Sequence, residues 1–340
     1  MPTVLESLNN ALHRVMENDD RVYVLGEDLL DPYGGAFKVT RGLSTKYPAH
    51  VLTTPISEAA IVGLANGMAM RGLRPVAEIM FGDFVTLIAD QLVNHAAKFN
   101  WMYNRNIKVP IVVRTPMGGR RGYGPTHSQS LEKMFMGVPG LKVVAPNTLG
   151  DPGQLLESAI ADDDPVLFVE HKLLYPRSLL EPGQGDLIDF KVHESGETYP
   201  NFILNIPNQV PQLTLATYGY NFELARAAVL NLLMEYEVFT EIVLFSQLSP
   251  FDLKILFESL QRTHRLLTVE EGTLSLGWGA ELAARAAERV NGLMIRRVAA
   301  LDLPIANTKS LEQSILPSVQ DITSAALRLT ERKGEVHDYI

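Results

Sequence analysis

The sequence contains no cysteine among its 340 residues. This absence excludes disulfide bonds, zinc sites built from thiolates and a thiol nucleophile. Positive charge is also scarce, because 30 Lys and Arg residues stand against 39 Asp and Glu residues and leave a net charge of −9. With no basic stretch to offset that charge, we expect no nucleic-acid partner. No apolar run is long enough to cross a membrane, and the first 20 residues have neither a signal nor a transit pattern, so we expect a soluble, cytoplasmic protein.

The common motifs for phosphate and metal binding are absent as well. The sequence has no GxxxxGK[ST] segment and no strand–GxGxxG–helix unit with an acid after it. It also lacks HExxH and the Asp-rich loop of an EF-hand. LGWGAE at 276–281 is a lone glycine turn that we expect to lead into a helix.

Short β-branched runs alternate with longer helical patterns along the first half of the chain. The expected strands are 22–25, 76–80, 109–114, 142–145 and 166–169, and the expected helices are 5–16, 61–70, 84–103 and 151–161. Strands that alternate with helices in this way predict a parallel, doubly wound sheet of the α/β class.

Residues 173–211 interrupt this rhythm with five prolines and no sustained periodicity, as is typical of a linker. A second strand–helix series follows. Its expected strands are 213–217, 242–245, 266–270 and 294–298, and its expected helices are 222–236, 252–261, 280–290 and 318–331. We therefore expect two doubly wound α/β domains, at 1–180 and 211–340, joined by a linker at 181–210.

Ligands of open α/β sheets bind beyond the carboxyl ends of the strands. Polar clusters that follow expected strands are therefore the candidates for chemistry. They are Gly26–Asp28, Thr53–Glu58, Gly118–Gln129 and Glu270–Gly272.

Two of these clusters contain a side chain suited to catalysis. Glu58 enters an apolar helix, and it is either an ordinary first-turn acid in a Ser-x-x-Glu-like cap or a carboxyl in a dry pocket with a raised pKa. The loop 118–129 is either a mobile connection or a glycine-rich segment that approaches a ligand and presents His127. We expect His95 and His171 to be structural, because each lies in or beside a regular element.

Long motifs in consistent order connect these candidates. LGEDLLDPYGGAFKVTRGL, TTPISEAAIVGLANGMAMRGLRPVAEIMFGDF, GPTHSQSLE, PGLKVVAP and LLTVEEG together resemble the β subunits of thiamine-diphosphate-dependent 2-oxoacid dehydrogenases. The resemblance covers nearly the whole chain and is strongest to pyruvate dehydrogenase and acetoin dehydrogenase. It implies a pyrimidine-binding α/β domain followed by a transketolase-type C-terminal domain.

The resemblance also implies a catalytic role for several residues. Glu58 matches the glutamate that hydrogen-bonds N1′ of the cofactor's aminopyrimidine and promotes loss of the proton from thiazolium C2. Phe84 and Met80 match residues that pack on or beside that ring. His127 matches a histidine that holds the substrate carboxylate or assists acyl transfer to a lipoyl carrier. Glu27 matches an acid near the pocket.

Further implied features are less visible in the side chains. Asp90 matches another acid near the pocket, although a helix-surface acid and a turn acid stay open as interpretations of Asp90 and Glu27. The resemblance also implies a potassium ion held mainly by main-chain oxygens. The matching positions are Ile111, Ala159, Ile160, Asp162 and Asp164.

The chain lacks the GDG segment that usually holds the cofactor's diphosphate and Mg²⁺, and Gly183–Asp186 does not replace it. We therefore expect a separate α subunit to hold both groups in an α2β2 heterotetramer. The product would pass to a lipoyl-bearing acyltransferase core, for which the tail GEVHDYI is a candidate contact.

These expectations lead to one function and its alternatives. The expected function is that of the β subunit of an oxidoreductase of the pyruvate dehydrogenase (acetyl-transferring) type, active only with an α subunit. The branched-chain members that the chain also resembles carry polar residues where Met80 and Phe84 stand, so the resemblance favours pyruvate or acetoin over branched-chain substrates. The alternatives are an acetoin dehydrogenase β subunit, a non-catalytic assembly subunit and a single-chain enzyme of the transketolase type.

Overall fold

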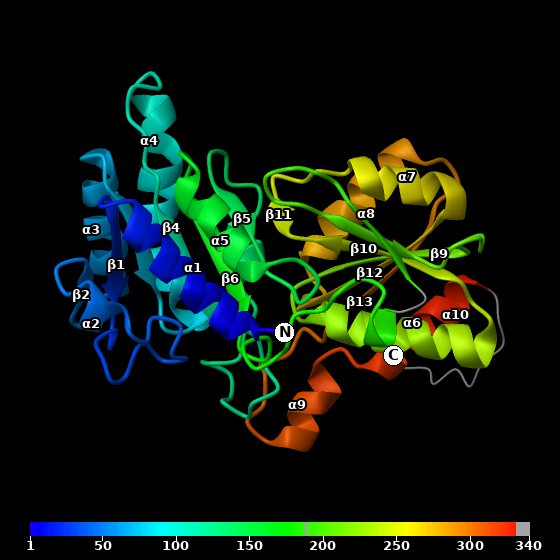
Figure 1. Ribbon diagram of the computed structural model, residues 1–340. Coiled ribbons are helices and arrows are strands. Elements are labelled where there is room, and N and C mark those ends of the chain that lie inside the picture. Colours follow the sequence, from blue (N-terminus) through cyan, green and yellow to red (C-terminus); the bar gives the residue numbers. More distant parts are fainter. Residues whose placement is uncertain (188–189, 331–340) are drawn as a thin grey trace. The chain divides into compact units, whose positions relative to one another are not determined.

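The computed structural model describes residues 1–187 and 190–330, so the tail GEVHDYI and the end of the expected C-terminal helix lie outside the described residues. The chain forms two compact units (Figure 1). The first contains residues 1–118, 126–179 and 247–250, and the second contains 119–125, 180–246 and the described residues from Phe251 onward. None of the described helices is long and apolar enough to cross a membrane.

A seven-stranded sheet forms the centre of the first unit, in the order β11-β5-β6-β4-β3-β1-β2. The strands are β1 Val22–Gly26, β2 Val51–Thr53, β3 Arg74–Glu78, β4 Val112–Met117, β5 Lys142–Val144, β6 Val166–His171 and β11 Gln247–Ser249. All neighbours pair in parallel except β11, which runs antiparallel to β5. The predicted α/β class is confirmed, with the difference that the sheet is mixed.

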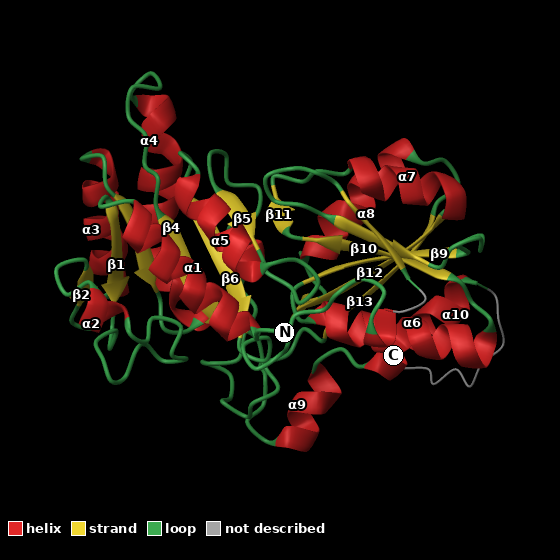
Figure 2. Cartoon of the chain, in the orientation of Figure 1, coloured by secondary structure: helices red, strands yellow, loops and turns green. Residues whose placement is uncertain are grey.

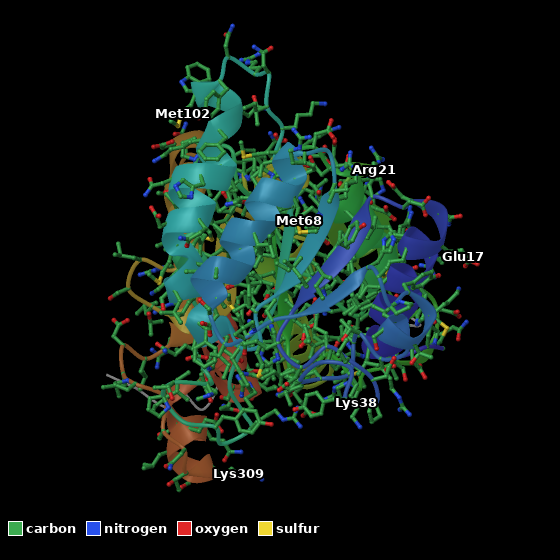
Figure 3. The ribbon with its side chains drawn as sticks, turned by 90° about the vertical axis from the view of Figure 1, so that its left-hand side faces the viewer. Glu17, Arg21, Lys38, Met68, Met102 and Lys309 are labelled. Atoms are coloured by element: carbon green, nitrogen blue, oxygen red, sulfur yellow. The ribbon has the colours of Figure 1, made fainter. Side chains whose placement is uncertain are left out.

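The helices of the first unit follow their apolar periodicity. α1 (Val4–Asn18) begins with a capping box between Thr3 and Glu6 and buries Leu8 and Leu12. α3 (Glu58–Met70) and α5 (Pro152–Ala161) occupy the segments expected for helices, and α2 (Leu43–Lys46) adds a single turn. Figure 3 shows α3 with Met68 on it and Met102 at the end of a further helix, α4 (Ala97–Met102).

The long helix predicted for 84–103 is wrong. The segment forms a 3₁₀-helix at Gly82–Ile88, a π-helix at Gln91–Ala96 and then α4. Buried positions 82, 85 and 88 recur every three residues, which is the 3₁₀ period. The side-chain amide of Asn66 donates to the carbonyl oxygen of Gln91 at 2.9 Å, where the helix widens.

The second unit contains a six-stranded sheet in the order β13-β12-β9-β10-β8-β7 (Figure 2). Its strands are β7 Lys191–Glu194, β8 Phe202–Asn205, β9 Leu213–Tyr218, β10 Thr240–Phe245, β12 Arg265–Thr273 and β13 Met294–Ala300. Its helices are α6 Asn221–Tyr236, α7 Lys254–Thr263, α8 Trp278–Arg289, α9 Lys309–Ile315 and α10 Val319–Leu329. The last four strands pair in parallel, whereas β8 and β7 are antiparallel.

The segment 181–210, expected to be an irregular linker, contains two of these strands. β8 is largely buried and pairs with β10, and β7 pairs with β8 at the edge of the sheet. β7 was not predicted because its side chains KVHE are mostly exposed and carry no alternating apolar pattern. An edge strand of this kind needs no buried face of its own.

Candidate active site

The predicted cofactor and substrate residues follow four strands that are neighbours in the first sheet. Strands β4, β3, β1 and β2 are adjacent, in that order. Glu27 comes directly after β1, Glu58 five residues after β2, Met80 two residues after β3, and His127 in the loop after β4. Because carboxyl ends of parallel strands share one edge, the topology directs these four residues to the same edge of the sheet.

Glu58 is the first residue of α3 and is 7% exposed. The preceding Ser57 makes no capping hydrogen bond through its side chain, so the expected cap is not formed. Within the described part of the chain, the Glu58 carboxyl has no hydrogen-bond partner. Buried carboxyl groups in proteins are normally hydrogen-bonded, so a group in this state is suited to receive one from a ligand.

Glu27 lies close enough to Glu58 for their charges to interact. Its side chain is largely buried, and burial raises its pKa. The negative charges of Glu58 and Asp28 raise that pKa further. Glu27 therefore holds a proton more readily than a carboxyl group in water.

Half-buried aromatic side chains surround His127. Its ring lies edge-on to Phe81 and Phe84, with centroid distances of 4.8 and 5.4 Å. The Lys172 ammonium, on a fully buried side chain, donates a 2.5 Å hydrogen bond to the His127 carbonyl oxygen and lies 5.3 Å from the Phe81 ring centroid. The predicted residues Phe84 and His127 are thus in contact. Phe81 and Lys172, which were not predicted, also contact His127.

Asp83 links the Phe84 turn to the segment THSQ. One carboxylate oxygen accepts hydrogen bonds from the backbone N–H and the side-chain amide of Gln129, at 3.3 and 2.8 Å. The other oxygen is buried without a hydrogen-bond partner in the described part of the chain. No sequence signal singled out Asp83, because an acid in the first turn of a helix is common.

Gly118 and His171 meet at the base of the loop that leads to His127. A Cβ on Gly118 would lie 2.0 Å from Nε2 of His171, and its φ of +90° also favours glycine. His171 ends β6 and is 8% exposed, while His95 lies in the π-helix and packs against Phe99.

Of the five residues expected to bind potassium, Ala159, Ile160, Asp162 and Asp164 lie in or just after the last turn of α5. The fifth, Ile111, directly precedes β4. The carbonyl oxygens of Ile160 and Asp162 both accept from Nη1 of Arg74 at 2.8 Å. Lys142 forms ion pairs with the Asp162 and Asp164 carboxylates at 2.6 and 3.1 Å. This end of α5 therefore attracts positive charge, which Arg74 and Lys142 already supply.

Two other predicted acids have different positions. Asp90 is exposed and accepts a hydrogen bond from Asn94 at 2.8 Å, as a helix-surface acid does. Glu270 belongs to β12 of the second unit, where its carboxylate accepts from the backbone N–H groups of Trp278 and Gly279 at 2.7 and 2.8 Å. It therefore caps the N-terminus of α8. Among the described residues, no cluster of three His, Cys, Asp or Glu side chains is arranged to hold a metal ion.

Comparisons with known families and proteins agree with the two α/β units. Residues 1–178 match the transketolase pyrimidine-binding domain, and residues 204–322 match the transketolase C-terminal domain. The chain is 36% identical to the pyruvate dehydrogenase E1 component subunit beta-2 of Oryza sativa, over 97% of this chain and 86% of that protein. The chain belongs to the β-subunit family of the thiamine-diphosphate-dependent 2-oxoacid dehydrogenases.

Other members of this β-subunit family match over almost their full length. The pyruvate dehydrogenase E1 component subunit beta of Rickettsia bellii is 34% identical, over 96% of this chain and 98% of that protein. The acetoin:2,6-dichlorophenolindophenol oxidoreductase subunit beta of Cupriavidus necator is 35% identical, over 97% of each. A solved structure titled split gene transketolase, inactive beta4 tetramer, has the same fold, with a TM-score of 0.72, 17% identity and coverage of 98% of this chain and 99% of that one.

Proposed function

We propose that this chain is the catalytic β subunit of a pyruvate dehydrogenase complex, which decarboxylates pyruvate oxidatively and transfers the acyl group to a lipoyl carrier. The observation that carries the proposal is Glu58, a residue only 7% exposed whose carboxyl has no hydrogen-bond partner in the described part of the chain and which follows the same sheet edge as Phe84 and His127. Acetoin is the second candidate substrate, because the Cupriavidus necator relative matches as well as the pyruvate dehydrogenase subunits do.

The residues present fit the aminopyrimidine ring of thiamine diphosphate. Glu58 would hold N1′ of its aminopyrimidine, and the half-buried side chains of Phe84 and Met80 would pack against it. When bound, the cofactor supplies a nucleophilic carbon and an electron sink for decarboxylation.

The roles of the two acids follow from their surroundings. Glu58 would exchange a proton with N1′, and burial strengthens that hydrogen bond because little water competes for it. Burial and the charges of Glu58 and Asp28 raise the pKa of Glu27, so Glu27 takes up a proton more easily, and a protonated Glu27 would place no second negative charge beside Glu58. His127 would hold the substrate carboxylate or assist acyl transfer, and the rings of Phe81 and Phe84 shield it from water.

The remaining components are assigned to partners. We assign the diphosphate and Mg²⁺ to an α subunit in an α2β2 heterotetramer, because this chain has no GDG segment. Trp101, Met102 and Tyr103 at the end of α4 are 76%, 61% and 48% exposed, which suits a surface covered by another subunit. A lipoyl acyltransferase core as acyl acceptor, and a cytoplasmic location, stay predictions.

A potassium ion at the end of α5 also stays a proposal. A carbonyl oxygen has two lone pairs, so those of Ile160 and Asp162 can bind an ion while they accept from Arg74. The carboxylates of Asp162 and Asp164 would favour the ion electrostatically.

The experiment co-produces the chain with an α-type subunit that contains GDG and measures dye reduction with pyruvate and with acetoin. Glu58→Gln is expected to lower turnover by about 10²–10⁴-fold, because the side chain no longer exchanges a proton. Glu17→Gln, on the exposed side of α1, is the matched control and is expected to leave turnover unchanged. Normal turnover of the Glu58 variant would contradict the proposal, and a wild-type complex inactive with both substrates would favour an assembly subunit.

A further inference from the structure

Lys172 directly follows strand β6 and is fully buried in the first unit. A lysine is rarely buried to this extent, because its ammonium group loses its hydration and needs compensating contacts. Its contacts include the carbonyl oxygen of His127, which accepts from Nζ at 2.5 Å, and the ring of Phe81, whose centroid lies 5.3 Å from Nζ. A buried charge thus binds the backbone of His127, to which the proposed function gives a role in the reaction.

Asp83 holds the same segment two residues further along the chain. It is a buried residue in the first turn of the 3₁₀-helix. One of its carboxylate oxygens accepts from both the backbone N–H and the side-chain amide of Gln129, at 3.3 and 2.8 Å. The carbonyl oxygen of Gln129 in turn accepts from the N–H of Gly118 at 3.3 Å, directly after β4. Gln129 is therefore fixed through its backbone and its side chain.

The ring of His127 has one nitrogen left for a ligand. Nδ1 lies within hydrogen-bond distance of the Thr126 hydroxyl, at 3.0 Å, and the ring lies edge-on to Phe81 and Phe84. Nε2 has no hydrogen-bond partner within the described part of the chain. The hydrogen bond at one ring nitrogen decides which form the other nitrogen takes. Nε2 is therefore the atom that can act on the substrate, and the surrounding contacts determine where it lies.

We propose that Lys172 and Asp83 are positioning residues, which fix the backbone of residues 127–129 and thereby place Nε2 of His127 for the reaction. This inference rests on the role given to His127 in the proposed function. All the contacts that support it lie within the first unit. A displacement of a reacting group by about 1 Å can reduce catalysis about 100-fold, so loss of either anchor is expected to affect the rate.

The first test measures dye reduction by the complex of this chain with an α-type subunit. Lys172→Met keeps the length of the side chain but removes its charge and its donor, so kcat/KM for the preferred substrate is expected to fall by about 10–100-fold. Lys46→Met is the matched control at an exposed lysine of the same unit, and its kcat/KM is expected to stay at the wild-type value. Wild-type kcat/KM with Lys172→Met would overturn the inference.

Asp83 allows a comparison of two variants of similar size. Asp83→Asn keeps an acceptor oxygen toward Gln129, so its kcat/KM is expected to stay within about 5-fold of the wild-type value. Asp83→Leu has no acceptor, and its kcat/KM is expected to fall by about 10–100-fold. A residue that only fills space would give the same kcat/KM in both variants, and that result would overturn the role of Asp83.

A double-mutant cycle distinguishes positioning from general structural support. If Lys172 acts through His127, the losses from Lys172→Met and His127→Asn are expected to be non-additive, and additive losses would overturn the inference. Wild-type activity with His127→Asn would instead contradict the role of His127 in the proposed function, and with it the basis of the inference. A loss with His127→Asn but none with Lys172→Met or Asp83→Leu would overturn the inference alone.

Amide hydrogen exchange in the same complex tests the anchoring without catalysis. In the wild type the amides of Gln129 and Gly118 are expected to exchange slowly, because Asp83 and Gln129 accept their hydrogen bonds. Asp83→Leu should accelerate exchange at both amides, while slow exchange in the central strands β3 and β4 shows that the variant is folded. Fast exchange at both amides in the wild type would show that the segment is not anchored and would overturn the inference.

Discussion

Arg114 lies with two carboxylates in the interior of the first unit. Its guanidinium donates to both oxygens of Glu170 at 2.7 and 2.8 Å and to Glu78 at 2.9 Å, and all three side chains are buried. The Tyr175 hydroxyl adds a 2.7 Å hydrogen bond to Glu170. Burial raises the pKa of Glu78, against the opposing effect of the Arg114 charge. One guanidinium therefore compensates two buried acids that lie on β3 and β6.

Arg114→Met is expected to lower the free energy of unfolding by about 3–5 kcal/mol, because it leaves both carboxylates buried without their cation. Denaturant unfolding of the chain measures this loss. Tyr175→Phe removes a single hydrogen bond to a charged acceptor and is expected to cost about 1.5–3 kcal/mol. A methionine variant within about 1 kcal/mol of the wild type would show that the guanidinium is not needed for stability.

The raised pKa of Glu27 predicts a pH-dependent difference in stability. A carboxyl whose pKa is higher in the folded state binds its proton more tightly there, so its contribution is largest at low pH. That contribution is lost as pH rises from the ordinary carboxyl value of 4.5 through the raised pKa. The stability of Glu27→Gln relative to the wild type should therefore increase with pH across this window and then level off.

Thermal unfolding of both proteins across this pH range measures the difference. Glu17→Gln, at an exposed position, is the control for the loss of one carboxylate charge. A constant difference between the Glu27 variant and the wild type would contradict the raised pKa.

Sequence motifs predicted Glu58, Phe84 and His127 because each lies in a long pattern of residues in consistent order. Lys172 could not be predicted, because its hydrogen bond to His127 spans 45 positions and no local pattern encodes it. Asp83 was missed because an acid in the first turn of a helix is common and because its partner Gln129 is 46 positions away.

At the scale of elements, long regular patterns were predictable and changes of period were not. α1 repeats its apolar residues over four turns, so its position followed from the sequence. The segment 82–102 changes from the 3₁₀ to the π and then to the α period within about 20 residues. Over so few positions the apolar residues fit more than one period, and contacts such as that of Asn66 decide the outcome.

The end of α5 gives a prediction for ions. If potassium shares the carbonyl oxygens with Arg74, it should stabilise the chain by about 1 kcal/mol, or about 2–4 °C in unfolding temperature, relative to sodium at the same ionic strength. Thermal unfolding in the two chloride salts measures this effect, with caesium as a control for ion size. Equal unfolding temperatures in all three salts would show that the positive charge of Arg74 and Lys142 suffices.

At the scale of the whole molecule, the two α/β units were predictable from the alternation of strands and helices, but the exchange of short segments between them was not. The loop 119–125 and strand β11 each group with the unit that the flanking chain does not belong to. Their membership depends on a few contacts, such as those of Glu312 and the pairing of β11 with β5. Local propensity contains no information about such pairings.

The absence of the GDG segment, which usually holds the diphosphate, predicts weak cofactor binding by this chain alone. Titration calorimetry with thiamine diphosphate and Mg²⁺ is expected to show little heat with the isolated chain and clear binding with the co-produced α subunit, because the diphosphate charge would otherwise be unpaired in a protein of net charge −9. Tight binding by the isolated chain would contradict the division of the site and favour a single-chain enzyme.

The segment exchange limits how this protein can be recombined with its homologues. A hybrid with a single crossover near residue 180 would give the first sheet a foreign edge strand and the second unit a foreign loop. A hybrid in which each unit comes entirely from one parent protein requires five junctions, after positions 118, 125, 179, 246 and 250. Gene shuffling at one breakpoint is thus expected to preserve the fold less often here than in chains whose halves are contiguous.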